Sequence, residues 1–154
     1  MKISFPRILI ALFCALGLGA CNDEPQDTHP GQPVAQRRLL FKQFTRTLEP
    51  MGMVARERLP FNRPEFIASA QELQQLARQP WRYFTPDSNY PPSHAKPEVW
   101  LKPAEFTQAQ QALQTKANEL AALAQSGSLE NIRAAVNDVQ KSCKTCHNQF
   151  RNDS

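Results

Sequence analysis

The sequence lacks a large excess of one charge. Its formal net charge is +4, from 18 lysines and arginines against 14 aspartates and glutamates. Two of the basic residues, Lys2 and Arg7, stand at the start of the chain, and the remainder has 16 basic and 14 acidic residues. The basic residues are scattered without a dense cluster. A chain this balanced is not expected to bind nucleic acid.

The sequence also lacks an apolar run of the roughly 20 residues that a membrane-spanning helix needs. The almost unbroken apolar run from Ile8 to Gly19 is shorter and follows a charged start, which is typical of an export signal. We predict this signal for residues 1–20. It ends in the tetrapeptide LGAC, which resembles a bacterial lipobox, so Cys21 is expected to become the first mature residue and to carry a lipid. The alternative is an ordinary cleavage site that contains a cysteine.

Residues 21–33 are predicted to form a disordered tether. They hold three prolines among Asp, Glu, Gln and Gly, a composition that cannot pack a core. Asn22, which follows Cys21, favours the outer membrane by analogy with known sorting rules. The expected location is therefore the periplasmic side of a Gram-negative envelope, with the protein held by its lipid.

Strand-like alternation and internal repeats are absent from residues 34–154. Apolar residues instead recur at spacings of three and four in four stretches, beginning near Val34, Pro64, Pro103 and Leu129. An antiparallel four-helix bundle is the natural architecture for four such helices with a long second connection.

The helix boundaries follow from proline, glycine and serine positions. Pro50 predicts a kink or break near Glu49 in the first helix, which is expected to run to about Arg58. Gly127 is expected to end the third helix and Ser128 to cap the fourth. Residues 80–103 contain six prolines and five aromatic residues. A purely solvated loop would not hold so many aromatics, so this connection is predicted to lie against the core.

Cysteine is scarce, and only the last two cysteines are expected to remain as thiols in the folded domain. Of four cysteines, Cys14 leaves with the signal and Cys21 is expected to be acylated, so Cys143 and Cys146 remain in the folded domain. The apolar rhythm of the fourth helix, continued past Val139, reaches both of them. The two thiols are therefore expected to face the bundle interior at one end of the bundle, with His147 one turn beyond Cys143.

The pattern C-x-x-C-H is typical of a c-type haem attachment site. Two thiols one helical turn apart can add to the vinyl groups on one edge of a haem, and the adjacent histidine can ligate the iron. A thioredoxin-like redox pair would need a βαβ context, which the sequence lacks. A zinc site would need a fourth ligand such as His29 or His94. A disulfide within one helical turn would be strained.

A second axial ligand would have to come from upstream, because only seven residues follow His147. Met51 and Met53 are the candidates, and both are better explained as core or loop residues beyond the proline. The upstream half of the first helix offers Phe41 and Phe44, and a phenyl ring cannot ligate iron. We therefore predict five-coordinate iron with an apolar distal pocket.

Together these residues resemble cytochrome c′, the high-spin class II c-type cytochromes, over roughly Val34 to Arg151. The segments that carry the resemblance are Leu59–Phe61, Gln79–Trp81, Lys96–Trp100 and Ala134–Arg151. The resemblance implies an antiparallel four-helix bundle with one covalent haem c, often assembled as a homodimer, with a solvent-screened distal pocket. A lipid anchor departs from the usual soluble form of the family.

The resemblance also implies roles for three residues. Arg37 would lie near a haem propionate, Phe41 above the iron and Arg151 on the proximal side. The apolar stripe independently puts Arg37 on the face of Phe41, and an inward arginine needs an anionic partner. The alternatives are a surface arginine at position 37 and, at position 151, a cation that favours the end of the helix dipole.

An open coordination position under an apolar residue such as Phe41 disfavours O₂, which benefits from a distal hydrogen bond, and admits NO and CO. We therefore expect a periplasmic c-type haem protein that binds NO and CO and carries electrons. The alternative is a dedicated electron-transfer cytochrome with little gas binding. An enzyme, such as a weak peroxidase or NO reductase, ranks last because no acid–base residue is visible near Phe41.

Overall fold

The computed structural model describes residues 26–152, so the predicted signal, Cys21 and Asn22 lie outside the described residues. Within that range every regular element is a helix. Four are long, which confirms the predicted fold class, and two short helices interrupt the long connection. The elements are α1 (Pro33–Ala55), α2 (Arg63–Leu76), the 3₁₀ helix η1 (Pro80–Tyr83), α3 (Glu98–Leu101), α4 (Pro103–Ser126) and α5 (Leu129–Phe150).

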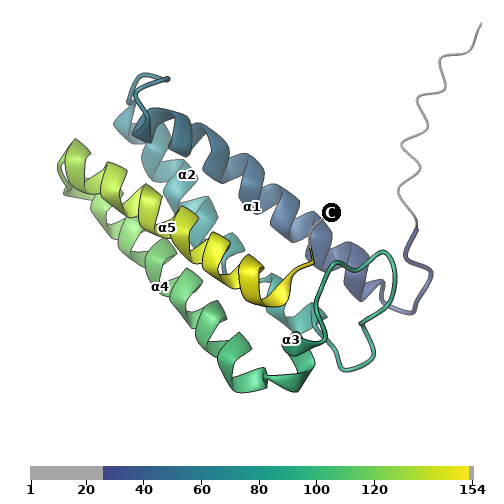
Figure 1. The fold of residues 1–154 in the computed structure, drawn as a ribbon. Coiled ribbons are helices and arrows are strands. Elements are labelled where there is room, and N and C mark those ends of the chain that lie inside the picture. The colour runs from purple at the N-terminus through teal and green to yellow at the C-terminus, as the bar shows by residue number, and fades with distance from the viewer. Residues whose placement is uncertain (1–25, 153–154) are drawn as a thin grey trace, which may run out of the picture.

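The four long helices form an antiparallel bundle (Figure 1). Helix α1 packs against α2 and α5, and α4 packs against the same two helices. The predicted apolar stripes meet in the bundle core, since one face of each helix repeats every three to four residues. The most buried members include Ala70, Leu73, Ala117, Leu120, Ile132, Val136 and Val139, all at 0 or 1% exposure.

Pro50 lies inside α1 without ending it. Of the predicted kink or break near Glu49, the break does not occur, and the helix ends at Ala55 rather than near Arg58. A proline removes one backbone hydrogen bond. Here the residues on either side, Leu48 at 9% and Met51 at 2% exposure, are anchored in the core, which holds the helix together across the proline.

Residues 21–33 were expected to form a disordered tether; within the described part, Gln26 and residues 28–32 are exposed, but Asp27 is anchored to the bundle. Asp27 is only 5% exposed. Its carboxylate accepts hydrogen bonds from the backbone N–H groups of Val34 and Ala35 at 3.0 and 3.1 Å, and so caps the first turn of α1. The Tyr90 hydroxyl donates to the same carboxylate at 3.0 Å, and the His29 ring stacks on Tyr90 with centroids 3.5 Å apart.

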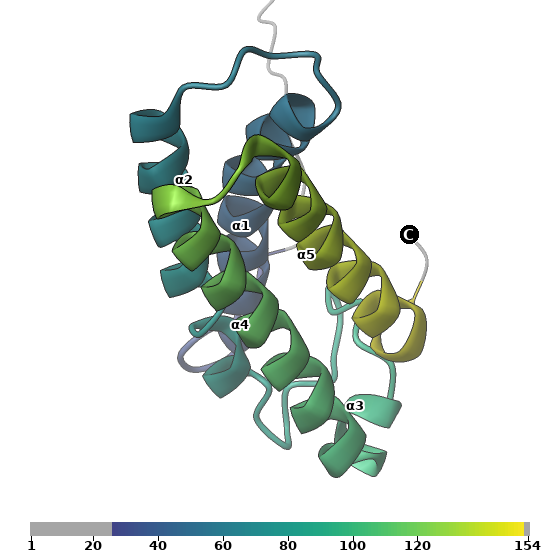
Figure 2. The same ribbon diagram turned by 90° about the vertical axis from the view of Figure 1, so that its left-hand side faces the viewer.

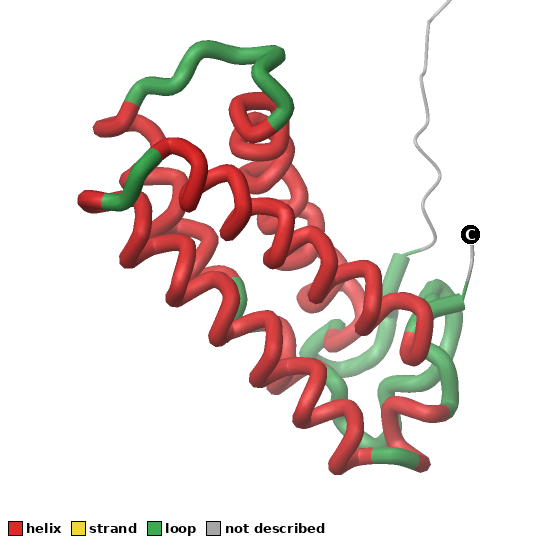
Figure 3. Tube along the Cα trace, turned by 60° about the vertical axis from the view of Figure 1, so that its left-hand side comes forward, coloured by secondary structure: helices red, strands yellow, loops and turns green. Residues whose placement is uncertain are grey.

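The connection between α2 and α4 is folded against the end of the bundle at which α1 begins and α5 ends (Figures 2 and 3). Its aromatic residues are half-buried, as predicted, and two of them pack against Phe106 of α4. Phe84 and Trp81 lie edge-to-face with Phe106 at centroid distances of 5.0 and 5.9 Å. The indole N–H of Trp100 donates to the Thr85 carbonyl at 2.9 Å, which ties α3 to the same cluster.

The opposite end of the bundle is closed by the turn between α4 and α5. Ser128 caps α5 as predicted, accepting a hydrogen bond from the Asn131 N–H at 3.1 Å. Gly127 follows α4, and a Cβ there would lie 2.7 Å from the Leu123 carbonyl oxygen, so this turn requires glycine. Arg63 donates to the carbonyls of Ala124 and Gly127, both at 2.9 Å. Within residues 26–152 no helix has both the length and the apolar character needed to cross a bilayer.

Candidate haem-attachment site

The two cysteines lie one turn apart near the end of α5 and are half-buried free thiols. Cys143 packs against the main bundle core, whereas Cys146 packs against a smaller cluster formed by Val99, Phe106 and Phe150. The pair therefore lies at the boundary between two apolar clusters, on the buried stripe that the sequence predicted.

Burial shifts the pKa values of both thiols and of the adjacent imidazole. Burial raises the pKa of the Cys143 thiol to about 11, with Cys146 adding to the shift, and burial alone raises that of Cys146 to about 11. Both thiols are therefore protonated at neutral pH. His147 is exposed at the surface. Partial desolvation of its ring, followed by the charge of Arg151, lowers the pKa of His147, which favours the neutral imidazole that ligates metals.

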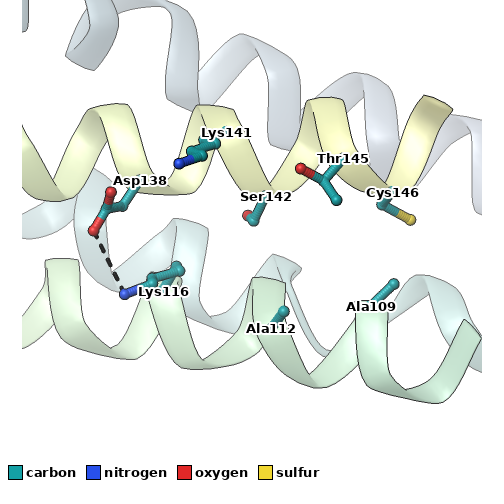
Figure 4. A pocket seen from close by; sticks show the side chains of 8 residues that line it. All are labelled: Ala109, Ala112, Lys116, Asp138, Lys141, Ser142, Thr145 and Cys146. Carbon is teal, nitrogen blue, oxygen red and sulfur yellow. Dashed lines mark ion pairs between the residues drawn. The ribbon is translucent and has the colours of Figure 1, made fainter. Parts of the chain in front are cut away.

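A groove of about 300 Å³ runs between α4 and α5 and ends beside the second thiol. Small side chains on both helices, Ala109 and Ala112 facing Ser142, leave this space open. Figure 4 shows Cys146 at one end of the groove and the ion pair between Lys116 and Asp138 at the other, with Nζ and Oδ2 3.5 Å apart. The sulfur of Cys146 thus has open space on its α4 side.

Phe41 is half-buried on α1 and faces the aromatic connection. Its ring lies edge-to-face with Trp81 at 5.7 Å and with Phe84 at 6.4 Å between centroids. Contacts of Phe106 with Phe84 and Phe150 continue this aromatic wall to α5, at 5.0 and 5.2 Å. The end of the bundle that holds the two thiols is therefore lined by apolar rings.

Arg37 points inward, as predicted, and is 3% exposed. Its two terminal nitrogens donate four hydrogen bonds of 2.7–2.8 Å, to the Tyr83 carbonyl, to the carbonyl and hydroxyl of Ser88, and to the Ser93 hydroxyl. The guanidinium also lies over the Phe84 ring at 4.5 Å. Arg37 thereby holds the loop between η1 and α3 against α1.

An anionic partner was expected for the inward Arg37. All four hydrogen-bond acceptors are neutral. Burial lowers the pKa of Arg37, and the nearby Tyr90 and Asp27 oppose this shift. A haem propionate as the partner of Arg37 stays a prediction, and these four bonds compete with it.

Arg151 is exposed beside His147, and its backbone N–H donates to the His147 carbonyl at 3.0 Å. Two backbone hydrogen bonds fix the chain on either side, from Lys96 to the Phe150 carbonyl at 2.9 Å and from Asn152 to the His94 carbonyl at 2.8 Å. This pairing of the connection with the end of α5 was not predicted, since residues more than 50 positions apart carry no local pattern for it.

The remaining candidate ligands do not gather near the thiols. Met51 belongs to the main core, and at 1.5 Å per residue it lies about 15 Å along α1 from Phe41, away from the thiol end. No group of three or more His, Cys, Asp or Glu suited to a metal ion occurs within residues 26–152, so the zinc alternative lacks its ligands there. The described chain also contains no βαβ unit, which removes the context of a thioredoxin-like pair.

Comparison with known proteins points to one family. The sequence profile described as "Cytochrome C'" matches residues 32–151. Cytochrome c′ of Alcaligenes xylosoxydans xylosoxydans is 37% identical over 101 residues, covering 66% of this chain and 78% of the relative. Cytochrome c′ of Rubrivivax gelatinosus is 25% identical over 123 residues, covering 79% and 95%.

Solved structures agree with the sequence relatives. The nitric oxide complex of a variant cytochrome c prime from Alcaligenes xylosoxidans superposes with a TM-score of 0.77 at 32% identity, covering 82% of this chain and 98% of that one. A carbon-monoxide-bound variant of the same protein gives the same TM-score, identity and coverage.

The donor set on α5 fits the group that this family carries. Two free thiols one turn apart, an adjacent neutral imidazole and a wall of aromatic rings are suited to a covalently attached haem c, the cofactor of the family. The family comprises haem-binding proteins rather than enzymes. From the matched span, the identities and the shared fold, this chain belongs to the cytochrome c′ family.

Proposed function

We propose that Cys143 and Cys146 form the two thioether bonds to haem c and that His147 is its iron ligand. The observation that carries this proposal is the position of the two thiols, half-buried at the boundary of two apolar clusters with the imidazole directly after them. The haem supplies an iron atom that binds diatomic gases and exchanges an electron. The surrounding side chains hold its apolar faces out of water.

The face of the haem opposite His147 is proposed to have no protein ligand. Phe41 and its neighbour Phe84 have only ring carbon and hydrogen, and the indole N–H of the adjacent Trp81 already donates to the Ala77 carbonyl at 2.7 Å. Met51 lies too far along α1 to serve. A five-coordinate iron under an apolar residue suits NO and CO, and relatives of this chain have been solved with each of these gases. The proposed function is therefore the binding of NO and CO by a c-type haem protein.

The absorption spectrum of the purified ferric and ferrous protein tests this function. Covalent haem with a high-spin ferrous spectrum that shifts on addition of CO or NO is expected. Cys143→Ser and Cys146→Ser should each retain at most one thioether, and haem should be lost from the double variant on a denaturing gel. Ser142→Ala is the matched control on the same helix. A low-spin ferrous spectrum that CO does not change would contradict the open coordination position.

Electron transfer is a second candidate, and the position of the half-buried thiols near the end of α5 favours it. A haem attached there is close to any partner that docks on α5. A five-coordinate iron reorganises more on redox change than a six-coordinate one, which makes such a haem a slower shuttle. Stopped-flow mixing of the reduced protein with an oxidised periplasmic acceptor, with and without NO, separates the two roles.

We further propose that the protein is exported and held by a lipid on Cys21 on the periplasmic side of a Gram-negative envelope, with Asn22 favouring the outer membrane. The motif LGAC after an apolar run supports this location. The protein should pellet with membranes, and Cys21→Ser should release it. Mass spectrometry of the N-terminal peptide would identify the lipid, and an unmodified Cys21 would contradict the anchor.

A homodimer is proposed as the assembled state. Leu39 on the outer face of α1 is 51% exposed, and a second copy packed there would cover it. Sedimentation of the holoprotein should give the mass of a dimer, and Leu39→Lys should shift it toward the monomer. A monomer at all concentrations would refute this assembly.

A further inference from the structure

The N-terminal segment is fastened at the same end of the bundle as the proposed haem site. The Asp27 carboxylate caps α1 and accepts a hydrogen bond from Tyr90 in the long connection. The His29 ring stacks on Tyr90 at 3.5 Å. The connection in turn pairs with the end of α5 through Lys96 and Phe150. We call the contact of Asp27 and His29 with Tyr90 the clip.

The clip limits how far the bundle can stand from a lipid on Cys21. From Cys21 to Asp27 the chain has six Cα–Cα steps, about 20 Å when fully extended. Helix α4 has 24 residues, and at 1.5 Å per residue it is about 36 Å long. The tether is therefore too short for the opposite end of the bundle, at Gly127, to rest on the membrane while the clipped end points away from it.

An exposed apolar residue marks the tip of the clipped end. Leu101 of α3 is 75% exposed, compared with 51% for Leu39 and 44% for Leu59. Figure 2 shows α3 at the lower tip of the bundle, beside the start of α4. Lys102 follows it with a side chain that is 53% exposed, and its Nζ lies 3.6 Å from Oε2 of Glu105. A leucine beside a lysine suits the boundary between lipid tails and headgroups, where the apolar chain is buried and the ammonium group stays in water.

We propose that the lipid surface is the partner of this end of the bundle, with Leu101 as the contact, so that the haem-binding end faces the membrane. The inference rests on the proposed lipid at Cys21 and on the proposed haem site. In this orientation an apolar gas that leaves the bilayer meets the haem end first. The exposed face of α5 between Asp138 and Cys146 stays open to soluble partners.

Quenching of a fluorescent lipid by the haem tests the orientation. The signal-free holoprotein, with Cys143 and Cys146 expected to be occupied by haem, would be coupled through Cys21 to a maleimide lipid in phosphatidylcholine vesicles. These vesicles would hold a trace of headgroup-labelled fluorescent lipid. The matched control carries Cys21→Ser and Ser126→Cys, which attaches the opposite end. Coupling through position 21 should quench the headgroup dye several-fold more than coupling through position 126.

Two sets of variants separate the contact from the clip. Leu101→Gln should lower the quenching, whereas Leu59→Gln, which changes an exposed leucine in the turn between α1 and α2, should leave the quenching unchanged. Asp27→Ala and the milder Tyr90→Phe should each lower the quenching. Loss of the clip frees more of the chain after Cys21, so the bundle can stand farther from the lipid. Equal quenching through positions 21 and 126, or no effect of Leu101→Gln, would overturn the proposal.

The anchor and the orientation fail in different measurements. If cells do not acylate Cys21, the wild-type protein will not pellet with membranes, and the proposed anchor is then wrong. The chemically coupled protein still reports which end faces the lipid. If the purified protein carries no covalent haem, the absorption spectrum shows this before any vesicle is made.

Discussion

Replacing Arg37 by alanine should cost the bundle a large part of its stability. The side chain is 3% exposed and donates four hydrogen bonds of 2.7–2.8 Å to the loop between η1 and α3. A hydrogen bond from a charged donor contributes about 1.5–3 kcal/mol net, and bonds from one group are not additive. Breaking a buried charged network typically costs about 3–5 kcal/mol, and we expect this range for Arg37→Ala.

The assay is urea denaturation of the holoprotein followed by circular dichroism, with the free energy of unfolding taken from the midpoint and slope. Arg46→Ala, an exposed arginine on the same helix, is the control and should change stability by less than about 0.5 kcal/mol. Arg37→Lys should fall between the two, because an ammonium group cannot reproduce the planar fork of donors.

A double-mutant cycle with Ser88→Ala separates the loop role of Arg37 from a propionate role. If Arg37 acts through the loop, the two substitutions should be coupled by about 0.5–3 kcal/mol. Additive effects, or a loss below about 1 kcal/mol for Arg37→Ala, would refute the reasoning. A spectral change with additive stability effects would instead support a propionate as the partner of Arg37.

Three further predictions concern the pocket, the N-terminal cap and the far turn. Phe41→Ala should raise the rate of CO and NO binding by about tenfold, equivalent to ~1.4 kcal/mol. Flash photolysis would measure the rates, with Phe61→Ala as the control. Equal rates in Phe41→Ala and the wild type would contradict the pocket role. Burial opposes the charge of Asp27, but hydrogen bonds from Ala35, His29, Tyr90 and Val34 prevail, so its pKa is lowered from 3.8. The contribution of Asp27 to stability is therefore present above pH 3.8 and lost as pH falls through the folded pKa. Urea midpoints of the wild type and of Asp27→Asn, measured between pH 3 and 7, should converge in acid. Parallel curves would exclude the cap. Gly127→Ala should lower the free energy of unfolding by about 1–3 kcal/mol, because the added Cβ meets the Leu123 carbonyl. Ser126→Ala is the control. An unchanged urea midpoint for Gly127→Ala would show that the turn can shift.

Local patterns predicted the bundle well and its end contacts poorly. The apolar stripes of the stretches that begin near Pro103 and Leu129 lie in the core as predicted, since a helix brings residues three and four apart to one face. The break offered as one alternative at Pro50 does not occur, because burial of Met51 outweighs one missing backbone hydrogen bond. Nothing near Asp27 in the sequence indicates that it caps a helix seven residues later and meets Tyr90.

The sequence by itself determined the spacing of the thiols, the imidazole that follows them and the helix that carries all three, because these depend on neighbours along one chain segment. Only the tertiary structure decided what surrounds them. It brought the start of α1, the loop that holds Ser88 and the end of α5 to one place, and it gave Arg37 neutral partners. Contacts between segments 50 or more residues apart depend on how the helices pack, and no local periodicity records that.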